Sequence, residues 1–173
     1  DKSISQRAVI IGSLINQDMT IEGFLNGEDP ISTINALNAI GSAIEINNTN
    51  VTIKQRETAF SSPKDDVDLG NSGTGMRLMM GLISSLGINV RLVGDKSLSK
   101  RPMLRVSEPL NLMGANILCR DGMPPVQITK GNIKNNFSYD MPIASAQVKS
   151  SIILAALAAN ESVKVKEKYQ TRN

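Results

Sequence analysis

The sequence contains little that could serve disulfide, metal or aromatic chemistry. It has no histidine, no tryptophan, one cysteine and only 3% aromatic residues. The lone cysteine, Cys119, excludes an internal disulfide and is typical of proteins in a reducing compartment, so we expect a cytoplasmic protein. Because the chain offers no cluster of His and Cys ligands, we expect no bound metal.

Long apolar runs and strong net charge are also missing. No apolar stretch approaches the ~20 residues of a membrane-spanning helix, and no signal peptide precedes the first motif, so we expect no membrane association. The formal net charge is only +3, which argues against a nucleic-acid partner. At 173 residues and 40% hydrophobic content, the chain is large enough for one globular domain.

One pattern occurs three times, in KSISQRAVIIGSL, NSGTGMRLMMGLISSL and ASAQVKSSIILAALA. Each copy begins with small polar residues, then has one cation (Arg7, Arg77 or Lys149) and continues as an apolar run of helix length. The cations are spaced about 70 positions apart, too far for a short solenoid repeat. The spacing favours tandem α/β subdomains.

The segments between these copies also correspond. DPISTINALNAIGSAIEI and RPMLRVSEPLNLMGANIL each place a proline, Pro30 or Pro102, at an expected first helical position. Each helix is expected to end near a glycine, Gly41 or Gly114, before a strand. We therefore predict an α/β fold of β-α-β-α-β-β units, with boundaries at about 1–65, 66–134 and 135–173, the third unit being truncated.

The first helix of each unit is apolar around most of its circumference, which predicts three buried parallel helices. Their N-termini should emerge on one face and offer unpaired N–H groups with partial positive charge. The nearby cations then predict a site for phosphates or carboxylates; they are Lys2, Arg7, Arg77, Arg101 and Lys149. In the alternative interpretation, Ser3 and Ser145 are simply N-caps and the cations are solvated, but capping alone requires no repeated cation.

Four blocks in order, DKSISQRA, LGNSGTGMRL, DKSLSKRPM and PIASAQVKSSIILAAL, resemble the signatures of the 5-enolpyruvylshikimate-3-phosphate synthase family. The resemblance runs from Asp1 to Asn173. The related UDP-N-acetylglucosamine enolpyruvyl transferases are the main alternative enzyme, but their opening block pairs the lysine with asparagine, where this chain has Lys2 and Ser3. A non-catalytic polyanion-binding or RNA-binding module and a purely structural repeat scaffold are further alternatives.

The resemblance implies a fold of the inside-out α/β barrel type and a two-domain enzyme. This chain would be an incomplete N-terminal domain, with the second domain absent. Family members transfer the enolpyruvyl group of phosphoenolpyruvate to the 5-hydroxyl of shikimate 3-phosphate and release phosphate, a step of aromatic amino-acid biosynthesis. The expected partners are these two small substrates and a C-terminal domain in cis. No cofactor is expected, and the chain alone should be inactive.

The resemblance also assigns roles by motif. Lys2 would contact both substrates, either as a proton donor or as a fixed electrostatic clamp. The further shikimate 3-phosphate contacts would be Ser3, Arg7, Ser145, Ala146, Gln147 and Arg172; those for phosphoenolpyruvate would be Asn71, Gly73, Arg101 and Gln147. Arg77 and Lys149 should support the loops. Glycine at position 73, where some relatives have alanine, implies sensitivity to glyphosate.

Overall fold

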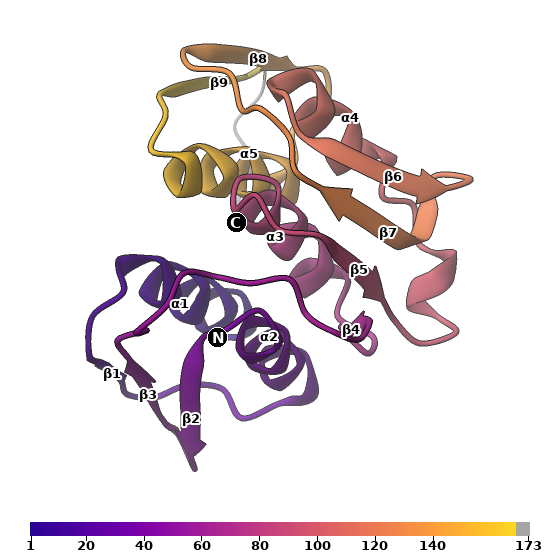
Figure 1. Ribbon diagram of the computed structural model, residues 1–173. Helices are drawn as coiled ribbons and strands as arrows, with labels where there is room; N and C mark the ends of the chain where they lie inside the picture. The colour runs from indigo at the N-terminus through magenta and orange to yellow at the C-terminus, as the bar shows by residue number, and fades with distance from the viewer. Residues whose placement is uncertain (169–173) are drawn as a thin grey trace.

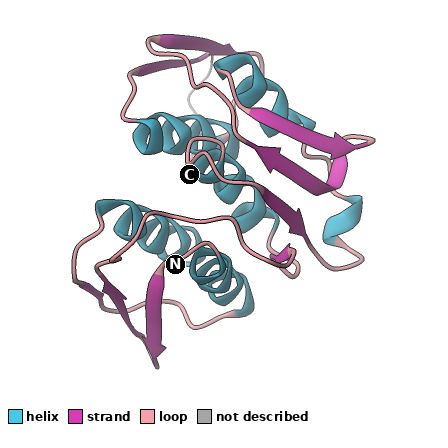
Figure 2. Ribbon diagram, in the orientation of Figure 1, coloured by secondary structure: helices cyan, strands magenta, loops and turns pink. Residues whose placement is uncertain are grey.

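The computed structural model describes residues 1–168, which fold as an α/β protein with three separate sheets (Figures 1 and 2). The first part of the chain forms α1 (Lys2–Ile15), β1 (Met19–Ile21), α2 (Glu28–Ala39), β2 (Ala43–Asn47) and β3 (Asn50–Lys54). Its sheet is antiparallel with the order β1-β3-β2. Alternate residues Val51 and Ile53 of the central strand are buried, so one face of this sheet covers the core.

The middle part contains β4 (Val67–Asp68), α3 (Gly73–Ile83), β5 (Val90–Val93), a short 3₁₀ helix η1 (Leu98–Lys100), α4 (Leu104–Met113), β6 (Asn116–Arg120) and β7 (Met123–Thr129). The last part contains β8 (Phe137–Met141), α5 (Ala146–Ala159) and β9 (Val163–Glu167). Strand β4 pairs in parallel with β5, and β8 pairs in parallel with β9. Each pair is connected through a helix, α3 or α5, as parallel strands require.

Helix α3 lies in the middle of the molecule, between α1 and α5 (Figure 1). All of its residues except Thr74 and Arg77 are buried, as its apolar composition predicts. It packs closely against α5 at Gly81, where an added Cβ would lie 2.2 Å from the carbonyl oxygen of Ser151. Glycine therefore allows the two helix backbones to approach each other directly.

Helices α1 and α5, the first helices of the other two units, are not buried on all sides, contrary to expectation. Ile11 and Ile15 of α1 and Ile153 and Leu157 of α5 are between 40% and 52% exposed. Within residues 1–168, α1 and α5 have neighbouring elements on only part of their circumference, so an apolar sequence does not bring complete burial.

The two prolines also differ from their expected positions. Helix α2 begins at Glu28, so Pro30 is its third residue, and α4 begins at Leu104, so Pro102 precedes the helix. Both positions avoid a lost helical hydrogen bond, because the first N–H groups of a helix have no partner within it. The proline pattern therefore locates each helix start to within about two residues.

Candidate anion-binding site at three helix N-termini

The N-terminal turns of α1, α3 and α5 lie together, and side chains join each pair of them. Arg7 Nη2 donates to Ser150 Oγ at 2.9 Å, between α1 and α5. Arg77 Nη1 donates to Gln147 Oε1 at 3.0 Å, between α3 and α5. Gln6 Nε2 donates to Ser72 Oγ at 2.9 Å, between α1 and the N-cap of α3. The three positive helix ends therefore share one face of the molecule.

A short side chain caps each of these helices. Asp1 accepts from the backbone N–H of Ile4 at 3.0 Å, and Ser72 Oγ accepts from that of Gly75 at 3.1 Å. Ser145 Oγ accepts from the N–H of Val148 at 3.4 Å, so Ser145 is an N-cap, as the alternative interpretation expected. That interpretation is wrong for Ser3, which lies inside α1 and presents its carbonyl oxygen to Arg7 Nη1 at 3.0 Å.

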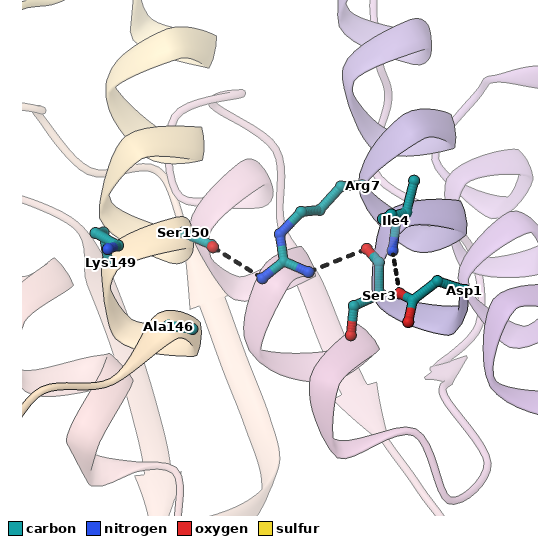
Figure 3. Close-up of a pocket in the computed structure, with 7 residues that line it drawn as sticks. All are labelled: Asp1, Ser3, Ile4, Arg7, Ala146, Lys149 and Ser150. Carbon is teal, nitrogen blue, oxygen red and sulfur yellow. Dashed lines mark hydrogen bonds between the residues drawn. The ribbon is translucent and has the colours of Figure 1, made fainter. Parts of the chain in front are cut away.

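A cavity of about 520 Å³ opens between α1 and α5 (Figure 3). The Arg7 side chain extends across it from α1 towards α5. Its lining combines small, hydroxyl and cationic side chains, which suit an anion with hydroxyl groups; they are Asp1, Ser3, Ile4, Arg7, Ala146, Lys149 and Ser150. The cavity brings together three of the expected shikimate 3-phosphate contacts, Ser3, Arg7 and Ala146.

Lys149 lines this cavity, although the sequence interpretation gave it only a supporting role. Its Nζ also lies 2.9 Å from a carboxylate oxygen of Glu167 on β9. The ion pair anchors the end of the side chain to the neighbouring strand. Lys149 therefore lines the cavity and also supports the local structure through its ion pair with β9.

A second, smaller cavity of about 150 Å³ has Ser145 and Gln147 in its lining, together with Arg77 and Arg105. Burial lowers the pKa of Arg77, and the charges of Arg101 and Arg105 lower it further. An anion bound here would relieve this repulsion among guanidinium groups. Expected contacts from the Ser145–Gln147 segment are thus divided between two cavities.

Asn71, Gly73 and Arg101 come together at the start of α3. Arg101 Nη2 donates to Asn71 Oδ1, and a Cβ added at Gly73 would lie 3.0 Å from Arg101 Nη1. The same Cβ would lie 3.2 Å from Arg77 Nη1, so the absent side chain leaves room for two guanidinium groups over the helix end. These contacts bring together three residues expected to bind phosphoenolpyruvate.

Lys2 lies apart from the lining of both cavities, and its Nζ is 2.8 Å from Asp29 Oδ2 at the start of α2. The lysine side chain is 51% exposed, so its ammonium remains accessible to a ligand. Arg172 lies outside the described residues.

Sequence reasoning did not assign three residues that build this face: Ser150, Thr74 and Gln6. Ser150 follows Ala146 by four positions and so shares its helix face, a signal that helical periodicity could have revealed. Thr74 Oγ1 accepts from Gln147 Nε2 at 3.0 Å, and Gln6 also contacts residues distant in sequence. Such long-range partners leave no local signal in one sequence.

Residues 1–168 contain neither a metal-binding cluster nor a membrane-spanning helix. No three His, Cys, Asp or Glu side chains in this range are grouped as a metal ion would need. In the same range, no helix combines the length and apolar character needed to cross a membrane.

Comparison with known proteins identifies the family. Residues 1–172 match the family model described as EPSP synthase (3-phosphoshikimate 1-carboxyvinyltransferase). The chain belongs to the EPSP synthase family. It is 46% identical over 173 residues to the 3-phosphoshikimate 1-carboxyvinyltransferase of Thermoanaerobacter sp. (strain X514), covering 100% of this chain and 41% of that relative. The corresponding protein of Oceanobacillus iheyensis is 46% identical over 179 residues, with the same coverage.

The fold agrees with the family assignment. The structure of EPSP synthase from Acinetobacter baumannii matches with a TM-score of 0.89 at 41% identity, over 100% of this chain and 40% of that one. The expected α/β fold of the EPSP synthase family is thereby confirmed. The chain spans about two-fifths of the length of these relatives.

Proposed function

We propose that this chain forms the shikimate 3-phosphate side, and part of the phosphoenolpyruvate side, of a cytoplasmic enolpyruvyl transferase of the shikimate pathway. The complete enzyme would transfer the enolpyruvyl group of phosphoenolpyruvate to the 5-hydroxyl of shikimate 3-phosphate and release phosphate. One observation carries the proposal: Ser3 and Arg7 of α1 and Ala146 of α5, which is distant from them in sequence, line one cavity between two helix N-termini. Two anionic substrates require such a concentration of donors and positive charge.

The proposed shikimate 3-phosphate contacts follow from the geometry and the family. Arg7 and Ser3 would bind from α1, and Ser145, Ala146 and Gln147 would bind from the first turn of α5, with Arg172 as a further contact. The guanidinium of Arg7 has five N–H donors, and two of its contacts are to Ser3 and Ser150. Donors therefore remain for a ligand in the cavity.

The proposed phosphoenolpyruvate contacts are Lys2, Asn71, Gly73, Arg101 and Gln147. Lys2 would also contact shikimate 3-phosphate, as proton donor or as electrostatic clamp. Its ion pair with Asp29 supports the clamp, because the pair holds the charged ammonium in a defined position. We further propose that glyphosate inhibits the complete enzyme, since Gly73 adds no methyl group beside the guanidinium groups of Arg101 and Arg77.

The proposed organisation is an incomplete N-terminal domain with units at about 1–65, 66–134 and 135–173, completed by a second domain in cis. The separate sheets β1-β3-β2, β4-β5-β7-β6 and β8-β9 support this division. Since the chain covers 41% of a curated relative, we expect the isolated chain to bind substrate without catalysing turnover. Release of phosphate from the two substrates by the purified chain would contradict this.

Calorimetric titration tests the proposed substrate site. We expect saturable binding of shikimate 3-phosphate, weaker binding of shikimate, and a loss of at least about tenfold in affinity in Arg7→Ala, which removes a charged hydrogen-bond donor. Arg91→Ala is the matched control, because Arg91 lies on β5, is paired with Asp66 and lines neither cavity. Equal affinities for shikimate 3-phosphate in the wild type and Arg7→Ala would contradict the proposed site.

A further inference from the structure

Gln6 is a buried amide that connects three helices. Its side chain is fully buried on α1, one turn after Lys2. Its Nε2 lies 2.9 Å from Ser72 Oγ, 2.9 Å from Thr33 Oγ1 and 3.2 Å from the carbonyl oxygen of Asp29. A single amide therefore contacts the first turns of α2 and the N-cap of α3.

The partners of Gln6 belong to the phosphoenolpyruvate side of the proposed site. Ser72 lies between Asn71 and Gly73, and its hydroxyl caps α3. Asp29 accepts from Lys2 Nζ through its carboxylate. Gln6 thus connects the residue that holds Lys2 with the residue that fixes the start of α3.

Gly75 borders this amide and has no side chain that would fill the space beside it. A Cβ added at Gly75 would lie 2.7 Å from Ser72 Oγ, 2.9 Å from Thr33 Oγ1 and 3.1 Å from Gln6 Nε2. Glycine at position 75 therefore allows the three polar side chains to meet beneath the start of α3. Arg7, the next residue along α1, makes its contacts with Ser3 and Ser150 instead.

We propose that Gln6 is a positioning residue that fixes Lys2 relative to Asn71 and Gly73, and so sets the geometry of the phosphoenolpyruvate side. This inference rests on the proposed function. Lys2 is proposed to contact both substrates, but the contacts of Arg7 are separate from Gln6. Loss of the Gln6 amide therefore weakens phosphoenolpyruvate binding more than shikimate 3-phosphate binding. A misplacement of catalytic groups by as little as 1 Å has large effects on rate.

The test compares Gln6→Met with Val9→Ala in the full-length enzyme. Methionine keeps the length of the side chain and removes the donor, whereas Val9 is a fully buried apolar residue of the same helix without polar contacts. We expect Gln6→Met to raise the KM for phosphoenolpyruvate at least about tenfold and that for shikimate 3-phosphate less than about threefold. Val9→Ala lowers the melting temperature and leaves the ratio of the two KM values unchanged.

A second variant, Ser72→Ala, removes the acceptor instead of the donor and should shift the KM ratio in the same direction. An unchanged ratio of the two KM values in Gln6→Met overturns the inference. If Gln6→Met does not fold, an unchanged ratio in Ser72→Ala overturns it. If the wild-type enzyme shows no turnover with phosphoenolpyruvate, the proposed function fails instead. Hydrogen exchange then decides the role of Gln6: faster exchange of the Gly75 amide in Gln6→Met than in Val9→Ala supports it, and equal exchange overturns it.

Discussion

At Arg7, the two terminal nitrogens of one guanidinium donate to Ser3 of α1 and Ser150 of α5. These bonds fix the plane of the side chain, and a fixed planar donor loses less conformational entropy when it binds an oxyanion than a free one does. Lys149, in contrast, is held by a single ion pair to Glu167. The two cations of the cavity are therefore not equivalent, and Arg7 contributes more directional binding.

Gly73 controls the space at the start of α3. Alanine there would bring a methyl group to 3.0 Å from Arg101 Nη1 and 3.2 Å from Arg77 Nη1, so both flexible side chains would have to shift. We expect Gly73→Ala in the full-length enzyme to weaken glyphosate inhibition at least about tenfold, and to raise the KM for phosphoenolpyruvate by less. Steady-state inhibition kinetics measure both quantities.

The control for this variant is Gly27→Ala, because a Cβ at Gly27 has its first neighbour at 3.8 Å and lies outside both cavities. It should leave glyphosate inhibition unchanged. Comparable inhibition of the wild type and Gly73→Ala at equal glyphosate concentration would show that Gly73 does not set the space available to the inhibitor.

Among the elements, the contact of α3 with α5 depends on Gly81. A Cβ in Gly81→Ala would meet the backbone of Ser151 at 2.2 Å, and backbone atoms cannot rotate away. We expect a loss of about 3 kcal/mol in the free energy of unfolding, since overpacking exceeds the ~1 kcal/mol that alanine gains in a helix. Urea denaturation monitored by circular dichroism measures this loss.

Gly12→Ala in α1 is the matched comparison. Its Cβ would lie 2.5 Å from Ile53 Cδ1 and 3.2 Å from Met19 Sδ, both at the flexible ends of side chains. These ends can move, and the helix gains from alanine, so the net loss should stay below about 1 kcal/mol. Equal losses in the free energy of unfolding for Gly12→Ala and Gly81→Ala would mean that the α3–α5 contact tolerates an added methyl group as well as the packing around Gly12 does.

The sequence predicted the positions of the helices better than it predicted how fully each helix is buried. The apolar composition of α3 correctly predicted burial, but that of α1 and α5 overestimated it, because composition does not show how many neighbours a helix has. Strand β4 contains only Val67 and Asp68, the residues that pair with β5. Strand pairing depends on residues distant in sequence, which periodicity does not identify.

The candidate site was likewise predictable only in part. The repeated cations and small residues predicted three adjacent helix starts, because equivalent units place equivalent ends together. The sequence could not identify Asp1 as the cap of α1, since a cap depends on where the first turn begins. Nor could it show that Ser145 and Ala146 line different cavities, because adjacent helical residues point in different directions.

Across the whole molecule, the second helix of a unit, α2 or α4, packs where the first helices of two units meet. Helix α2 packs against both α1 and α3, and α4 packs against both α3 and α5. Within residues 1–168, α3 packs against both α1 and α5, but neither α2 nor α4 packs closely against both of them. Ile11 follows Arg7 by four positions and Ile153 follows Ser150 by three, so these apolar side chains continue the two helix faces that Arg7 joins.

This geometry predicts an exposed apolar surface on the isolated chain, formed by Ile11, Ile15, Ile153 and Leu157. We expect the chain to enhance the fluorescence of the apolar dye ANS, and the double variant Ile11→Lys, Leu157→Lys to lower the enhancement by at least about half. Leu118→Lys is the control, because Leu118 is 68% exposed but lies on β6, away from this surface. If the control and the double variant lower the fluorescence equally, the dye reports scattered apolar side chains. A selective effect of the double variant would place the apolar surface along α1 and α5, because both substitutions change only the faces that Arg7 joins.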